Sequence, residues 1–104
     1  MIVEFINKDL EELYEKGYSR KYKKVPKRVA EDFFPTTVLT LMNARNIQQI
    51  WSLRSLHFEK LTNTDRYSVR LDIRWRLEMK IDWTDKDCTV GIIGLTDLTK
   101  HYGD

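Results

Sequence analysis

The sequence has few of the features that would cross-link, export or anchor a protein. Cys88 is the only cysteine among 104 residues, so no disulfide can form within the chain. No basic stretch followed by an apolar segment marks a secretory signal at its start, and no apolar run approaches the ~20 residues that span a membrane. We therefore expect a cytoplasmic protein in a reducing compartment, without membrane association.

The composition nevertheless supports a compact core. Hydrophobic residues make up 41% of the chain and include three tryptophans, and the mean hydropathy of -0.54 is that of a water-exposed surface around such a core. At this length we expect a single domain over residues 1–104. Cys88 begins an apolar stretch that runs to Ile93, so we expect its thiol to fill the core rather than to act as a nucleophile.

Acidic residues are absent between residues 16 and 30, although the whole chain has 16 acidic and 18 basic side chains. This basic run (residues 16–30) holds seven cationic residues, namely Lys16, Arg20, Lys21, Lys23, Lys24, Lys27 and Arg28. Such a run can bind phosphate groups through the release of counterions. It can equally be a solvated loop between two helices, and composition alone leaves both interpretations open.

The first part of the chain predicts a strand followed by two helices. Residues 2–6 are rich in β-formers, and Asn7 is a good N-cap for a helix that Gly17 should end. Pro26 suits the first position of a second helix. Pro35 should kink or restart that helix, because proline lacks a backbone donor and crowds the preceding turn. We expect the second helix to end near residue 44.

The strongest pattern in the sequence lies between Tyr67 and Trp83, where every odd position is apolar and every even position is polar. A period of two indicates a sheet with one buried face. A single strand of this length would span roughly 55 Å, too long for so small a domain, so the segment should fold back as a hairpin. Only a loop with an odd number of residues keeps the odd positions of both strands on the same face of the sheet. This predicts a three-residue turn over residues 72–74. Arg70 and Arg76 then point together from the polar face.

The remaining segments complete the sheet. We expect a strand over residues 53–58, a turn over 62–65, a central strand over 88–95 and a short tail from Leu98. The order is then β-α-α-β-β-β-β. It predicts an α+β fold in which two N-terminal helices pack on one face of a small, mainly antiparallel sheet and leave its polar face open.

The residues around the predicted hairpin resemble a known family. The stretch Ser55-Leu56-His57-Phe58-Glu59-Lys60-Leu61 precedes Arg66-Tyr67-Ser68-Val69-Arg70-Leu71 and then Arg74-Trp75-Arg76-Leu77. In this order the segments resemble the HigB-type toxins of the RelE/ParE superfamily, whose pattern is a histidine, a lysine three positions on, a turn, a Tyr-Ser-Ile/Val-Arg strand and a Trp-Arg strand. The resemblance implies a RelE-like fold and a metal-independent endoribonuclease that cuts mRNA in the ribosomal A site.

The same resemblance implies a set of site residues. His57 matches the family's active-site histidine, and Arg76 would hold the scissile phosphate, since a planar guanidinium suits phosphate oxygens. Lys60 and Arg70 would bind the RNA backbone. His101 and Tyr102 are similar to the family's catalytic C-terminal residues, although the order Lys100-His101-Tyr102 departs from the usual Asp-Tyr-His ending. No metal and no cofactor are implied. Without the resemblance, the two arginines would read as solvated residues of the polar face.

The implied partners are a HigA-like helix-turn-helix antitoxin, the 70S ribosome with its A-site mRNA, and operator DNA only indirectly, through the antitoxin. Two alternatives stay open. ParE toxins share the fold but poison DNA gyrase without catalysis, and they lack the histidine and the basic set found here. A basic RNA-binding module without chemistry is the third interpretation.

Overall fold

The structure is a computed structural model that describes residues 1–100. Strand β1 (Ile2–Phe5) leads into helix α1 (Lys8–Lys16), which a long loop connects to α2 (Phe34–Asn43) and the short α3 (Ile47–Ser52). Four strands follow: β2 (Glu59–Lys60), β3 (Arg66–Arg70), β4 (Trp75–Trp83) and β5 (Gly91–Lys100). The sheet order is β1-β5-β4-β3-β2, with β1 parallel to β5 and the other pairs antiparallel. The expected order is confirmed, and the short helix α3 is present in addition to the predicted elements.

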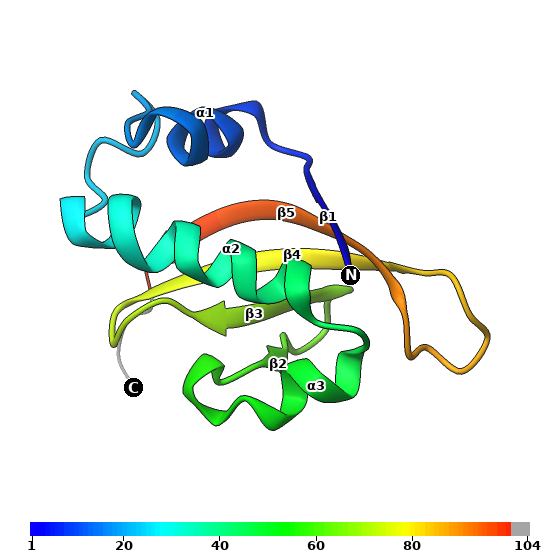
Figure 1. Cartoon of the computed structure of the whole chain (residues 1–104). Helices are drawn as coiled ribbons and strands as arrows, with labels where there is room; N and C mark the ends of the chain where they lie inside the picture. The colour runs from blue at the N-terminus through cyan, green and yellow to red at the C-terminus, as the bar shows by residue number, and fades with distance from the viewer. Residues whose placement is uncertain (101–104) are drawn as a thin grey trace.

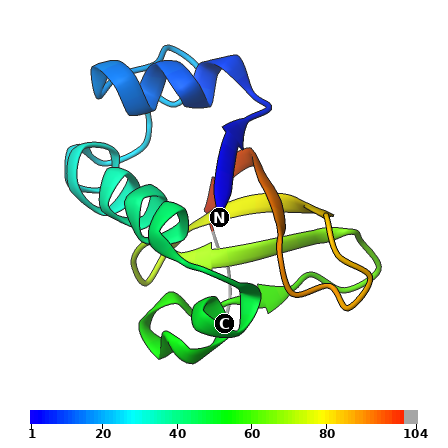
Figure 2. The same ribbon diagram turned by 45° about the vertical axis from the view of Figure 1, so that its right-hand side comes forward.

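One face of the sheet carries the core. Helices α1 and α2 lie on the same side of the sheet in both views, and α3 lies near the β2 edge (Figures 1 and 2). Leu13 of α1, Phe34 and Leu41 of α2, and Leu77 and Met79 of β4 are all buried in one apolar cluster. This arrangement confirms the predicted α+β fold. Among residues 1–100, no helix is long and apolar enough to cross a membrane.

The helix ends follow from individual residues. The Asn7 side chain accepts hydrogen bonds from the backbone N–H groups of Asp9 and Leu10, and Gly17 ends α1 in the left-handed conformation with φ 74°. The second helix begins just after Pro26 and contains a π-helical turn over Val29–Phe33 before α2 starts. That widened turn places Pro35 in the first turn of α2, where a missing backbone donor costs little. Pro35 therefore restarts the helix, as expected.

The β3–β4 hairpin has the predicted three-residue turn. Arg70 pairs with Arg76 in the register, and the Leu71 N–H donates to the Trp75 carbonyl at 2.8 Å. The Asp72 carboxylate closes the turn by accepting from the backbone N–H groups of Arg74 (2.8 Å) and Trp75 (2.7 Å). Odd positions of both strands face the helices and even positions face away, so the parity derived from the sequence is confirmed.

The predicted strand over residues 53–58 is wrong. Arg54–Leu56 form a 3₁₀ turn, and His57 follows with φ 46°, in the left-handed region. Leu56 and Phe58 are both buried while His57 is exposed, and this burial pattern has the same alternation as a strand. The Phe58 ring packs between Trp51, with centroids 4.5 Å apart, and Tyr67, at 5.3 Å. The strand itself is confined to Glu59–Lys60.

The prediction for Cys88 is also wrong, because its side chain is exposed. The Asp85 carboxylate accepts hydrogen bonds from the hydroxyl and N–H of Thr89 and from the Val90 N–H, which closes the turn between β4 and β5. Cys88 lies within this turn with φ 54°. Strand β5 therefore begins at Gly91 and continues to Lys100, through residues expected to form a tail, and its place between β1 and β4 confirms that it is central.

The basic run spans the end of α1, the loop after it and the start of the second helix, and it combines exposed cations with buried anchors. All seven of its basic side chains are exposed, whereas Ser19, Tyr22 and Val25 are buried. The Tyr22 hydroxyl donates to the Asp97 carboxylate at 2.7 Å and accepts from the Asn7 side-chain amide at 2.7 Å. Burial, followed by the hydrogen bond to Asp97, raises the pKa of Tyr22 well above its ordinary value. The loop is thus tied to the sheet and to the start of α1.

We expect Tyr22→Phe to lower the free energy of unfolding by about 1–2 kcal/mol, because it leaves the half-buried Asp97 carboxylate and Asn7 amide without their shared partner. The raised pKa adds a pH dependence. Stability is fully present below the ordinary tyrosine pKa of 10.0 and should fall as pH rises above it, since only the unfolded chain ionises readily there. Urea titrations at pH 7 and pH 10.5 measure both effects. Tyr18→Phe is the control, because Tyr18 is 60% exposed, and an equal loss in the two variants would contradict the prediction.

Candidate active site

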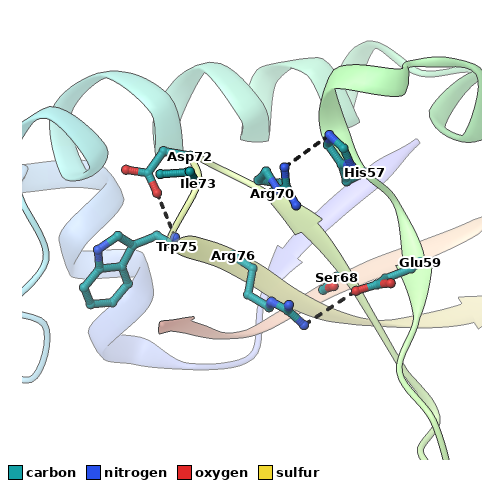
Figure 3. Close-up of a pocket in the computed structure, with 8 residues that line it drawn as sticks. All are labelled: His57, Glu59, Ser68, Arg70, Asp72, Ile73, Trp75 and Arg76. Atoms are coloured by element: carbon teal, nitrogen blue, oxygen red, sulfur yellow. Dashed lines mark hydrogen bonds and ion pairs between the residues drawn. The ribbon is translucent and has the colours of Figure 1, made fainter. Parts of the chain in front are cut away.

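A cavity of about 150 Å³ opens on the polar face of the sheet, at the end where the β3–β4 hairpin turns. Its lining residues come from the loop before β2, from the neighbouring strands β2, β3 and β4, and from the hairpin turn (Figure 3). The lining residues are His57, Glu59, Ser68, Arg70, Asp72, Ile73, Trp75 and Arg76. Three residues that the sequence singled out, His57, Arg70 and Arg76, therefore meet in one cavity.

The hairpin register places two arginines directly opposite each other on adjacent strands. Arg70 and Arg76 are direct cross-strand partners, and like charges in that position repel. Each arginine has a compensating contact in the cavity (Figure 3). Arg76 Nη1 lies 3.6 Å from Glu59 Oε1, and Arg70 Nη1 lies 3.4 Å from His57 Nε2. The side chain of Arg76 is only 19% exposed, so its charge lies deeper than a solvated surface arginine would.

His57 reaches the cavity because of its backbone conformation. Its left-handed φ ends the 3₁₀ turn, so the imidazole points out while its two neighbours, Leu56 and Phe58, are buried. A guanidinium can only donate hydrogen bonds, so the contact with Arg70 requires Nε2 to be the acceptor. The neutral tautomer with its hydrogen on Nδ1 is the one that allows this contact. This is the form that can take up a proton.

Glu59 is the residue that sequence reasoning missed. It pairs with Ser68 in the register, so it shares the polar face with Arg70 and Arg76. Its carboxylate is 57% exposed and is the acidic partner of Arg76. A strand predicted over residues 59–60 and paired with Tyr67 and Ser68 would have placed Glu59 on the polar face. The incorrect strand over residues 53–58 ended before Glu59 and so left it out.

Lys60 is not brought together with the other predicted residues. It pairs with Tyr67, an odd-numbered position, so the register places it on the helix side of the sheet, and it does not line the cavity. His101 and Tyr102 lie outside the described residues. The described chain ends at Lys100, opposite Trp75, which is a lining residue of the cavity.

The placement of Lys60 has a measurable consequence for RNA binding. We expect Lys60→Ala to change any RNA affinity or cleavage rate less than twofold, because its ammonium faces away from the two arginines. Arg70→Ala, at the cavity, should lower affinity at least tenfold, as the loss of a phosphate contact does. Fluorescence anisotropy with a labelled single-stranded RNA measures both. An equal loss of RNA affinity in the two variants would contradict this prediction and show that Lys60 belongs to the RNA-binding site.

The side chains in the cavity match the needs of phosphoryl chemistry. Two guanidinium groups can neutralise phosphate oxygens, and a neutral imidazole and a carboxylate can each accept a proton. Residues 1–100 contain no cluster of three or more histidine, cysteine, aspartate or glutamate side chains that could hold a metal ion. The groups present therefore suit acid–base catalysis on a bound phosphodiester.

Comparison with known proteins identifies the fold. No protein-family model matches the chain, and no curated protein matches it at the significance required. Among solved structures, the chain is similar to the YoeB/ParE toxin from Agrobacterium tumefaciens, with a TM-score of 0.52 and 13% sequence identity. The alignment covers 98% of this chain and 100% of that one. At this identity the likeness establishes the architecture alone, and the chain has the α+β fold of that YoeB/ParE toxin.

Proposed function

We propose that the chain is the toxin of a type II toxin–antitoxin pair and that it cleaves mRNA on the ribosome, as a metal-independent endoribonuclease of the HigB type. The observation that carries the proposal is the meeting of His57, Arg70 and Arg76 in one cavity on the open face of this fold. Arg70 and Arg76 also pair directly across adjacent strands and line the same cavity, so both can contribute positive charge to a bound phosphodiester.

The proposed reaction is a transesterification followed by release of the downstream fragment. The ribose 2′-oxygen attacks the adjacent phosphorus and loses its proton, while the bond from phosphorus to the 5′-oxygen breaks and that oxygen gains a proton. The products are a 2′,3′-cyclic phosphate and a 5′-hydroxyl. His57 in its neutral form would accept the first proton, and Arg76 would stabilise the charge that develops on the phosphorane. His101 and Tyr102 remain candidates for the second proton transfer on the resemblance alone.

The main alternative is a ParE-like toxin that poisons DNA gyrase without catalysis, and the fold is compatible with it. The grouping of an imidazole, a carboxylate and two guanidiniums favours the nuclease, because a binding-only surface requires no proton acceptors. The same grouping disfavours a basic RNA-binding module without chemistry.

The proposal includes partners. A HigA-like helix-turn-helix antitoxin would neutralise the toxin and link it indirectly to operator DNA, and the ribosome with its A-site mRNA would present the substrate in the cytoplasm. The exposed cations of the basic run suit contact with ribosomal RNA or with an acidic antitoxin surface, because surface charge of this kind accelerates encounter.

Paired assays on the purified protein distinguish the three candidate functions. Addition to a cell-free translation reaction, with primer-extension mapping of the mRNA, should give cuts at defined positions within codons. A gyrase supercoiling assay run beside it should be unaffected. Blocked supercoiling without cuts would instead identify a ParE-like toxin, and RNA binding without either effect would identify a binding module.

A further inference from the structure

Ile73 is unusually exposed for its type. It lies at the tip of the β3–β4 hairpin and is 79% exposed, which is the highest value among the large hydrophobic side chains of residues 1–100 that reach solvent. Single exposed apolar residues are common on protein surfaces, so exposure alone carries no argument. The position of Ile73 is informative, because this side chain lines the cavity that holds Arg70 and Arg76.

The turn itself does not need isoleucine. Its closing hydrogen bonds come from the Asp72 carboxylate and from the backbone of Leu71 and Trp75. Turns of this kind favour asparagine, aspartate or glycine, and a β-branched side chain contributes nothing to turn formation here. Packing gives no reason for it either, since four fifths of the residue remains in water. The fold therefore presents the Ile73 side chain to solvent without using it for packing or for the turn.

The surroundings of Ile73 suit a nucleotide. Two guanidiniums offer a site for a phosphate, and the apolar side chain of Ile73 lies on the rim of the same cavity (Figure 3). Single-stranded RNA presents the same combination, with a phosphate joined to a base whose flat face is apolar. Proteins that recognise unstacked bases pair cationic contacts to the backbone with apolar or aromatic contacts to the base.

We propose that Ile73 packs against the nucleobase next to the phosphate held by Arg70 and Arg76, and that it thereby helps to select the nucleotide at which the RNA is cut. The inference rests on the proposed function for the cutting step. The binding step stands separately, because it requires only that the cavity accepts single-stranded RNA.

The test compares Ile73→Ala with Ile2→Ala. Ile2 is the matched control, since it is also an isoleucine and is 63% exposed. It belongs to β1, the edge strand farthest from β2, and does not line the cavity. The probes are a short single-stranded RNA and the same RNA with one abasic ribose at the cut position. Ile73→Ala should weaken binding of the intact RNA roughly tenfold and leave binding of the abasic RNA unchanged. Ile2→Ala should alter neither, and both variants should melt as the wild type does.

Mapping of cut positions in translated mRNA completes the test. Ile73→Ala should redistribute the cuts among nucleotides, and Ile73→Leu should restore most of the original pattern because it returns the apolar surface. Equal weakening on intact and abasic RNA would overturn the proposal, since it would show a general effect on phosphate binding. Wild-type cleavage with an unaltered pattern in Ile73→Ala would overturn it while leaving the proposed function intact. A wild-type protein that binds RNA without cutting it would instead count against the proposed function.

Discussion

Arg76→Ala is expected to lower the rate of mRNA cleavage by about a hundredfold or more while the protein stays folded. A guanidinium that stabilises the phosphorane acts mainly in the transition state, and the loss of one such donor typically costs this much. The sequence pattern alone predicts a stability cost under ~0.5 kcal/mol for a polar-face residue. The structure raises that figure to about 1 kcal/mol, because the side chain is only 19% exposed and contacts Glu59.

Two further variants make the Arg76 prediction specific. Arg76→Lys should recover only part of the rate, since an ammonium cannot make a bidentate contact with phosphate. Arg74→Ala is the matched control, because Arg74 is an exposed arginine of the adjacent turn that does not line the cavity. Single-turnover cleavage rates and thermal melting of the purified variants measure the two effects separately. A folded Arg76→Ala protein that cuts at the wild-type rate would remove Arg76 from the mechanism.

His57→Asn is expected to reduce cleavage by roughly a hundredfold, the usual contribution of a positioned proton-transfer group. Asparagine is chosen because His57 has a φ of 46°, and asparagine tolerates the left-handed region better than alanine does. The substitution therefore removes the imidazole and keeps the backbone that places Phe58 in the core. His57→Ala should lose the same activity and also some stability.

Glu59→Gln distinguishes the two proton acceptors in the cavity. If His57 accepts the proton, Glu59→Gln should retain most of the cleavage rate and His57→Asn should not. The reverse result would assign the proton transfer to Glu59, whose carboxylate lies 3.6 Å from Arg76. Rates measured on one mRNA, with melting curves for each variant, decide between them.

The hairpin was predictable because its determinants are local. Parity between Tyr67 and Trp83 reflects one buried and one open face, and only an odd-numbered turn preserves it. The pairing of Arg70 with Arg76 follows from that parity and the three-residue turn alone. The α1 caps were predictable for the same reason, since Asn7 and Gly17 act on their own backbone neighbours.

The features that could not be predicted depend on side-chain contacts that leave no periodic pattern in the sequence. His57 leaves the strand pattern because Phe58 packs against Trp51 and Tyr67, which lie on either side of it in sequence. The Asp85 side chain sets the turn that exposes Cys88, and an apolar stretch in the sequence gave no sign of that. The β2–β3 register places Glu59 on the polar face that holds the cavity and Lys60 on the opposite face. Three of the four side chains that carry the proposed chemistry, His57, Arg70 and Arg76, were therefore predictable from the sequence, whereas the carboxylate of Glu59 was not.

The chemistry of the cut ends tests the central claim most directly. Purified protein is incubated with one mRNA, either free or engaged by translating ribosomes, and the new ends are characterised. The account predicts cuts only on ribosome-bound mRNA, with a 2′,3′-cyclic phosphate on the upstream fragment and a 5′-hydroxyl on the downstream one, and no such cuts with Arg76→Ala. Fragments that carry 5′-phosphate ends, or an mRNA left intact on translating ribosomes, would contradict it.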